Sequence, residues 1–259
     1  MKVPDFSSET NKFKFLKPAA YSVSIWTKVP FEKEQLLRSI IEFAKKFPEF
    51  DDFEADKDGS RLKLGYKTSI TDEEYYFRIM RNCSFEFVWG PSVKINLDEF
   101  ISRLINEMQN ILGISLLHIE GVDYKYYTIY NLETNISQLV WNTYFSNSPL
   151  NQALDLEMVN QDNFGFRGIL DKQRVYIIGF ESNVADKEVI EKKFSNDRLT
   201  ITCGIALVRD ISINAGLDNI INRHLDIASK LIRERFLPYI IEPMDRAIEE
   251  IENSKLSEK

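Results

Sequence analysis

Few residues of this 259-residue chain could carry out acid–base, nucleophilic or metal chemistry. Neither His118 nor His224 has a second histidine, cysteine or carboxylate at the spacing that places metal ligands on one helical face. Cys83 and Cys203 lie in strand-like apolar runs, where a buried structural thiol is favoured over a nucleophile. The sequence contains no glycine-rich phosphate loop and no GxSxG or HExxH motif. These residues favour a non-catalytic protein that holds neither a metal nor a cofactor.

Charge and composition restrict the partners. The chain has 33 basic and 40 acidic side chains and a formal net charge of −7, which disfavours bulk attraction to DNA, RNA or anionic lipid. No apolar run approaches the roughly 20 residues that a membrane span needs, and no signal-peptide pattern is visible. Two cysteines outside any CxxC motif are typical of reduced thiols. We therefore expect a cytoplasmic protein without membrane insertion.

Hydrophobic periodicity predicts the same succession of elements twice. The first set comprises a strand, a helix, three strands and a long helix, over 21–29, 32–47, 61–69, 75–81, 84–89 and 97–112. The second set comprises a strand, a short helix, four strands and a long helix, over 122–131, 137–145, 154–159, 164–170, 174–180, 198–208 and 217–236. Asn96 and Gly113 have the residue types that begin and end the first long helix.

Three segments lie outside this succession. The acidic run 51–58 ends in Asp-Gly and is predicted to be a solvated loop. Pro238 and Pro243 are predicted to break the last long helix before a short one over 244–253. We therefore divide the chain into an N-terminal arm, two α+β repeats, and a C-terminal helix with its tail, over 1–19, 20–113, 114–237 and 238–259.

A shift of the chain by 120 positions supports a duplication. It aligns Arg78–Arg103 with Arg198–Arg223 without a gap, and eight of the 26 pairs are identical. The predicted fold class is α+β: two pseudo-repeats of strand, helix, three or four antiparallel strands and long helix. They would form one curved antiparallel sheet with the helices on one face, plus the C-terminal helix. This arrangement resembles the duplicated saddle of the TATA-binding-protein and helix-grip kind.

Alternation along the strands predicts basic side chains, interleaved with tyrosines, on the helix-free face of this sheet. The seven cations are Arg61, Lys63, Lys67, Arg78, Lys125, Arg174 and Arg198. Cations and aromatic rings on an open sheet suit phosphate contact and base stacking, although an ordinary solvated sheet face has the same composition. The 18 Phe and 11 Tyr residues also suit a protein–protein interface, where aromatic side chains are enriched.

The layout resembles an uncharacterised, sporadically distributed family of prokaryotic proteins of similar length. The matching blocks are FEFVWGPSVKINLDEFISRLINEMQNILG before VDYKYYTIYN, and LTITCGIALV before LDNIINRHLDIASKLIRERFLPYIIEPMDRAIEEI. Asn131 matches the family's asparagine and His224 its helix histidine, whereas Thr128 and Ile129 stand at the family's Arg and Tyr. More distantly, the chain is similar to the accessory partners encoded beside short prokaryotic Argonautes, which help to hold guide or target nucleic acid.

The resemblance implies a non-catalytic partner subunit of a prokaryotic anti-phage or anti-plasmid defence complex, which contacts nucleic acid through that complex. An alternative is a helix-grip-type small-molecule-binding protein or enzyme, in which the sheet and a long helix enclose an apolar cavity. A third is a homodimer that pairs through sheet edges.

Overall fold

The computed structural model describes residues 4–28, 33–48, 52–55, 61–67, 74–80, 84–90, 96–113, 119–134, 136–146, 163–183, 196–208 and 217–257. The strands are β1 (Lys17–Thr27), β2 (Asp52–Ala55), β3 (Arg61–Lys67), β4 (Glu74–Met80), β5 (Ser84–Trp89), β6 (Ile119–Thr134), β7 (Asn163–Ile169), β8 (Arg174–Asn183) and β9 (Asn196–Val208). The helices are α1 (Ser7–Thr10), α2 (Lys33–Lys46), α3 (Leu97–Leu112), α4 (Ile136–Phe145), α5 (Leu217–Leu231), the π-helical segment η4 (Ile232–Ile241) and α6 (Glu242–Ser257).

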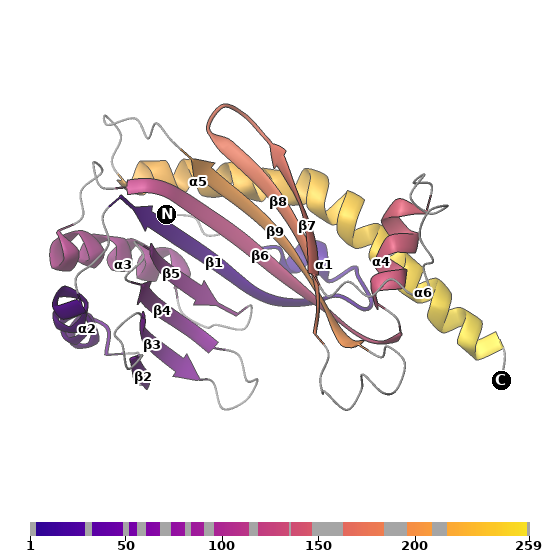
Figure 1. Cartoon of the computed structure of the whole chain (residues 1–259), viewed down its shortest axis with the longest axis horizontal. Helices are drawn as coiled ribbons and strands as arrows, with labels where there is room; N and C mark the ends of the chain where they lie inside the picture. Colours follow the sequence, from indigo (N-terminus) through magenta and orange to yellow (C-terminus); the bar gives the residue numbers. More distant parts are fainter. Residues whose placement is uncertain are drawn as a thin grey trace.

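The nine described strands form one antiparallel, unclosed sheet in the order β2-β3-β4-β5-β1-β6-β9-β8-β7. The sheet is curved, and α5 and α6 run along one side of it, with the C-terminus beyond the far end of α6 (Figure 1). The predicted α+β class, the curved antiparallel sheet and the one-sided helices are therefore confirmed.

Local sequence signals explain the bounds of α3. The Asn96 side chain accepts a hydrogen bond from the backbone N–H of Glu99 at 3.3 Å, and Gly113 follows the helix with a φ of 63°. That left-handed conformation suits glycine, so the helix ends there. One side of the helix buries Phe100 and Leu104 in the core. The cap residues predicted from sequence are confirmed.

The core lies between the sheet and the helices. On β1, Tyr21 stacks against Trp89 of β5 at 5.5 Å and against Tyr126 of β6 at 5.1 Å between ring centroids. A continuous aromatic layer therefore crosses the middle of the sheet. From the helix side, Phe100 packs within 5.1 Å of Phe87, and α5 buries Leu225. Offset aromatic pairs of this kind add to the free energy gained from burial alone.

Two predictions about local structure are wrong. The acidic run predicted to be a loop contains β2, which pairs with β3 from Asp52↔Gly65 to Ala55↔Leu62. Neither Pro238 nor Pro243 breaks the last helix, because Pro238 lies inside η4, the chain continues directly into α6, and Pro243 is the second residue of α6. The segment predicted as an N-terminal arm, over 1–19, contains α1, begins β1 and buries Phe6 in the core.

The two halves of the chain have the same order of elements. In each half, a central strand is followed by a helix and an antiparallel meander whose last strand returns to pair with the central strand. A long helix then follows, α3 in the first half and α5 in the second. The described strands number five in the first half and four in the second. This order agrees with a duplication, which stays a prediction.

Candidate binding surface on the helix-free face

β1 divides its side chains between the two faces of the sheet. Tyr21 and Ile25 are buried on the side covered by the helices, so Ser22, Ser24 and Trp26 belong to the opposite side. We call that opposite side the helix-free face, because the described helices pack on the other one. Its central positions are polar and buried: Ser22 is fully buried, and Ser24 and Glu86 are 4% and 5% exposed, whereas Trp26 is 36% exposed.

A row of charged residues crosses the helix-free face. The strand register sets Lys63 opposite Arg78, Arg78 opposite Glu86, Glu86 opposite Ser24, and Ser24 opposite Asp123. We call these five residues, which are four charged residues and Ser24, the charged row. Directly opposed residues have Cβ atoms about 5 Å apart. Two neighbouring cationic positions are therefore followed by two carboxylates within three strands.

Carboxylates of β2 and β4 also stand opposite two of the cationic positions of this face. The register sets Glu54 of β2 opposite Lys63, and Glu74 of β4 opposite Lys67. Opposite charges at directly paired positions attract each other, and their fields partly cancel at a distance. Carboxylate positions therefore alternate with cationic positions along this face, and the basic surface predicted from sequence stays a prediction.

Asp123 is the carboxylate of this row whose environment is best defined. Burial raises the pKa of its carboxyl group above the usual value, and the nearby Glu86 raises it further. A hydrogen bond from Trp26 Nε1, at 2.9 Å, and the charge of Lys125 act in the opposite direction. The hydrogen bond to Asp123 fixes the Trp26 indole on this face of the sheet, and part of the apolar surface of the ring remains accessible.

Lys125 occupies the next position on the same face, between Ser22 of β1 and Gly204 of β9. A Cβ atom built at Gly204 would lie 3.7 Å from the Lys125 Cγ, so the aliphatic stem of the lysine crosses the glycine. The hydroxyl of Ser22 is buried and has no hydrogen-bond partner among the described residues. This position therefore combines a cation with an unsatisfied buried hydroxyl.

Six of the seven predicted site residues occupy register positions of the helix-free face. Lys125 is half-buried there. Arg61, Lys63, Lys67, Arg78 and Arg198 are placed there by their strand pairing, and their side chains lie outside the described part of the structure. The predicted interleaving with tyrosines is wrong at Tyr124 and Tyr126, which are fully buried on the helix side.

Arg174 is the predicted site residue that lies on the other face. It pairs with Leu207, which is buried beneath the helices, and is itself 8% exposed. Its Nη1 donates a hydrogen bond to Asp171 Oδ2 at 2.7 Å, and its Nε has no hydrogen-bond partner among the described residues. The prediction that Arg174 points to the helix-free face is wrong. The segment Val175–Phe180 is apolar at odd and at even positions alike, so its pattern did not show which side of the strand is buried.

The predicted structural roles of His224 and Cys203 are confirmed. His224 is fully buried in α5, and its Nε2 lies 3.0 Å from the backbone oxygen of Ile205. Burial lowers the pKa of His224 to about 4 and raises the pKa of the Cys203 thiol. His118 and Cys83 lie outside the described residues. Among the residues that are described, no three histidine, cysteine or carboxylate side chains form a group that could hold a metal ion.

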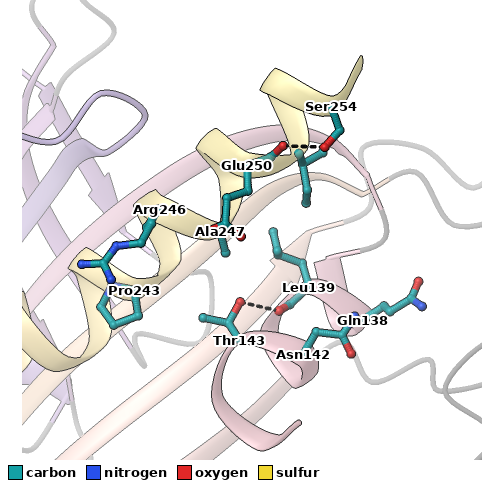
Figure 2. Close-up of a pocket in the computed structure, with 10 residues that line it drawn as sticks. Gln138, Leu139, Asn142, Thr143, Pro243, Arg246, Ala247, Glu250 and Ser254 are labelled. Atoms are coloured by element: carbon teal, nitrogen blue, oxygen red, sulfur yellow. Dashed lines mark hydrogen bonds between the residues drawn. The ribbon is translucent and has the colours of Figure 1, made fainter. Parts of the chain in front are cut away.

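A groove of about 480 Å³ lies between α4 and α6, away from the helix-free face. Figure 2 shows Gln138, Leu139 and Asn142 on α4 facing Ala247 and the neighbouring residues of α6. A second hollow, of about 550 Å³, lies beside the N-terminal segment and is lined by charged side chains of α5 and η4. None of these residues was predicted as a site, because their side chains are brought together only by helix packing.

No protein-family model and no curated protein matches the chain. Among solved structures, it is similar to an uncharacterised protein from Rhizobium leguminosarum, with 7% identity, 91% of this chain and 97% of that chain covered, and a TM-score of 0.13. It is also similar to CrmK, a flavoenzyme of caerulomycin biosynthesis, with 9% identity, 82% and 41% covered, and a TM-score of 0.19. For TP0453 the identity is 13%, the coverage 81% and 95%, and the TM-score 0.12. At these TM-scores the likenesses support neither a fold nor a function.

Among the described helices, none has the length and hydrophobicity that a membrane span requires.

Proposed function

We propose that the chain is a cytoplasmic, non-catalytic binding subunit that holds its partner on the helix-free face of the sheet. One observation carries this proposal: the described helices all pack on one face, and the other face bears Lys63 and Arg78 at one end of the charged row and a partly exposed Trp26 beside Asp123 at its other end. Tryptophan is enriched where proteins bind one another, and charged neighbours select the partner and its orientation.

The setting that we propose is a prokaryotic defence complex, in which an Argonaute-type partner and this chain together hold guide or target nucleic acid. The cationic positions share one face, which supports phosphate contact, whereas the alternating carboxylates limit the number of phosphates that this chain neutralises alone. The nucleic acid would therefore be retained by the complex and weakly by the isolated chain.

The first experiment is a tagged pull-down from the native host, with mass spectrometry of co-eluting proteins and the 260/280 nm absorbance ratio of the eluate. A stoichiometric partner together with a raised ratio is the expected result. A lone chain with a protein-like ratio would contradict the proposed function.

A pair of charge-neutralising variants tests the surface itself. Lys125→Gln removes a cation of the helix-free face, whereas Lys172→Gln removes an exposed cation in the turn between β7 and β8. We expect the Lys125 variant to retain several-fold less nucleic acid in the complex, with an unchanged melting temperature. Equal retention by both variants would remove nucleic acid from the proposal.

The alternative function is small-molecule binding, and the groove between α4 and α6 favours it because its volume falls within the range of ligand sites. The interface between α5 and the sheet, where a helix-grip cavity would lie, is occupied by buried side chains such as Tyr124, Ile205 and Leu225. A thermal-shift screen of metabolites against the wild type and Ala247→Trp would identify a ligand of this groove. The stabilisation must disappear in the variant.

A further inference from the structure

Among the described strands, β7 is the last in the sheet order and pairs with β8 alone. Residues 165–169 are all exposed, with Phe166 at 47% and Ile169 at 88%. Its register with β8 is regular over all seven residues. Natural edge strands usually carry a proline, a bulge or several charges that prevent pairing, and β7 has one charged residue, Arg167.

We propose that two copies of this chain pair through β7, in antiparallel orientation, with the two-fold axis at Phe166. This inference does not depend on the proposed function. Directly opposed residues of antiparallel strands lie on the same face of a sheet, and residues of one strand alternate between the faces. A two-fold axis perpendicular to the sheet must therefore pass through the position of one residue, which then stands opposite its own copy, and not between two residues. Phe166 is the middle residue of the strand, so an axis there pairs all seven residues.

The sequence NFGFRGI is self-complementary in this register. Asn163 stands opposite Ile169 of the second copy, Phe164 opposite Gly168, and Gly165 opposite Arg167. Phe164 and Arg167 thus each stand opposite a glycine, and Arg167 does not stand opposite the Arg167 of the second copy. An axis at Arg167 would instead set the two arginines directly opposite each other, which is destabilising.

Aromatic packing on the helix side supports the same axis. Phe166 lies 5.4 Å from Phe145 of α4, which lies 5.4 Å from Trp141, between ring centroids. Two Phe166 side chains paired at the axis would join this aromatic cluster to that of the second copy. Cross-strand aromatic pairs stabilise sheets, and the exposed part of Phe166 would be covered.

Cross-linking tests the axis directly. Phe166→Cys places two thiols opposite each other within the reach of a disulfide, and Tyr239→Cys places an exposed thiol in η4 as the control; both variants carry Cys83→Ser. Mild oxidation should give a disulfide-linked dimer with the Phe166 variant and only traces with the Tyr239 variant. Absence of the dimer, or equal yields from both variants, would overturn the proposal.

The mass in solution provides a second test. Light scattering of the wild type at tens of micromolar should give twice the chain mass of 30.3 kDa. Phe166→Lys sets two like charges at the axis and should give the monomer mass, whereas the matched Tyr239→Lys should remain a dimer. Circular dichroism and melting temperature check that both variants fold. A monomeric wild type, or a Phe166→Lys dimer, would overturn the proposal.

Discussion

Burial keeps His224 neutral, and this makes the stability of the chain depend on pH. The folded-state pKa of His224 is about 4, below the ordinary value of 6.5, chiefly because the side chain is buried. Arg174 lowers this pKa further, while the bond to Ile205 and the charge of Asp171 raise it. Above pH 6.5 the histidine is neutral in both states. As the pH falls from 6.5 to about 4, the unfolded chain gains a proton that the folded chain excludes, so stability decreases.

The loss attributable to His224 is on the order of 3 kcal/mol across this interval. Denaturant unfolding of the wild type and His224→Gln at a series of pH values measures it, because glutamine can still donate to the Ile205 oxygen but does not titrate. The difference between the two proteins should shrink in that interval as the wild type loses stability. Parallel pH profiles would contradict the assignment.

The hydrogen bond from Trp26 to Asp123 leads to a second prediction at the scale of single residues. Trp26→Phe removes the N–H donor that stabilises the carboxylate, so the pKa of Asp123 should rise further above its usual value. Carbon-detected NMR titration of the labelled side chain measures this change. Tyr239→Phe, a change at an exposed ring elsewhere, should leave the pKa where it was. A lower or unchanged pKa in the Trp26 variant would show that the hydrogen bond is not made.

The sequence predicted only part of the site, because the alternation of polar and apolar residues assigns the two faces of one strand but not the pairing between strands. The alternation of Ser22, Ser24 and Trp26 is visible in YSVSIWT, and the face of Lys125 follows from its neighbours. The pairing of Glu86 with Ser24, and of Ser24 with Asp123, depends on register between strands far apart in the chain. Hydrophobic periodicity carries no information about that register, so the charged row could not be predicted.

At the scale of elements, Gly121 sets how closely β6 approaches β9. A Cβ atom at Gly121 would lie 2.8 Å from the backbone oxygen of Leu207, closer than real contacts allow. Gly121→Ala should therefore lower the free energy of unfolding by about 1–3 kcal/mol. A Cβ atom at Gly179 would lie 3.9 Å from the Thr202 Cβ, an ordinary van der Waals contact, so Gly179→Ala should stay within about 0.5 kcal/mol of the wild type. Equal effects in chemical denaturation would contradict the close approach.

Elements with explicit end signals were predicted most accurately. The bounds of α3 were correct because Asn96 and Gly113 mark its ends. β2 was missed because its acidic side chains are typical of a loop, whereas pairing with β3 makes it an edge strand. The continuation through Pro238 was also missed. In η4 the wider turn accommodates a proline that an α-helix would exclude, which a local helix rule does not anticipate.

At the scale of the whole molecule, the two halves depend on each other. β1 pairs with β6 over most of its length, and the aromatic layer of Trp89, Tyr21 and Tyr126 crosses that junction. A chain of residues 1–113 would lack one neighbour of β1 and one side of this layer. We therefore expect it to be unfolded alone and to fold when co-expressed with residues 114–259. A dispersed NMR spectrum from the first piece alone would contradict this expectation.

The junction between β1 and β6 also has a consequence for how the protein is made. Roughly 100 residues separate the two strands, and ribosomes add about 5–20 residues per second, so β1 waits about 5–20 s for its partner. Until β6 is made, the edge of β1 that β6 will cover stays unpaired in the nascent chain. The apolar side chains Tyr21, Val23 and Ile25 lie along this strand. Chaperone capture at this edge, and a pause in synthesis before β6 emerges, would therefore govern the yield of native protein.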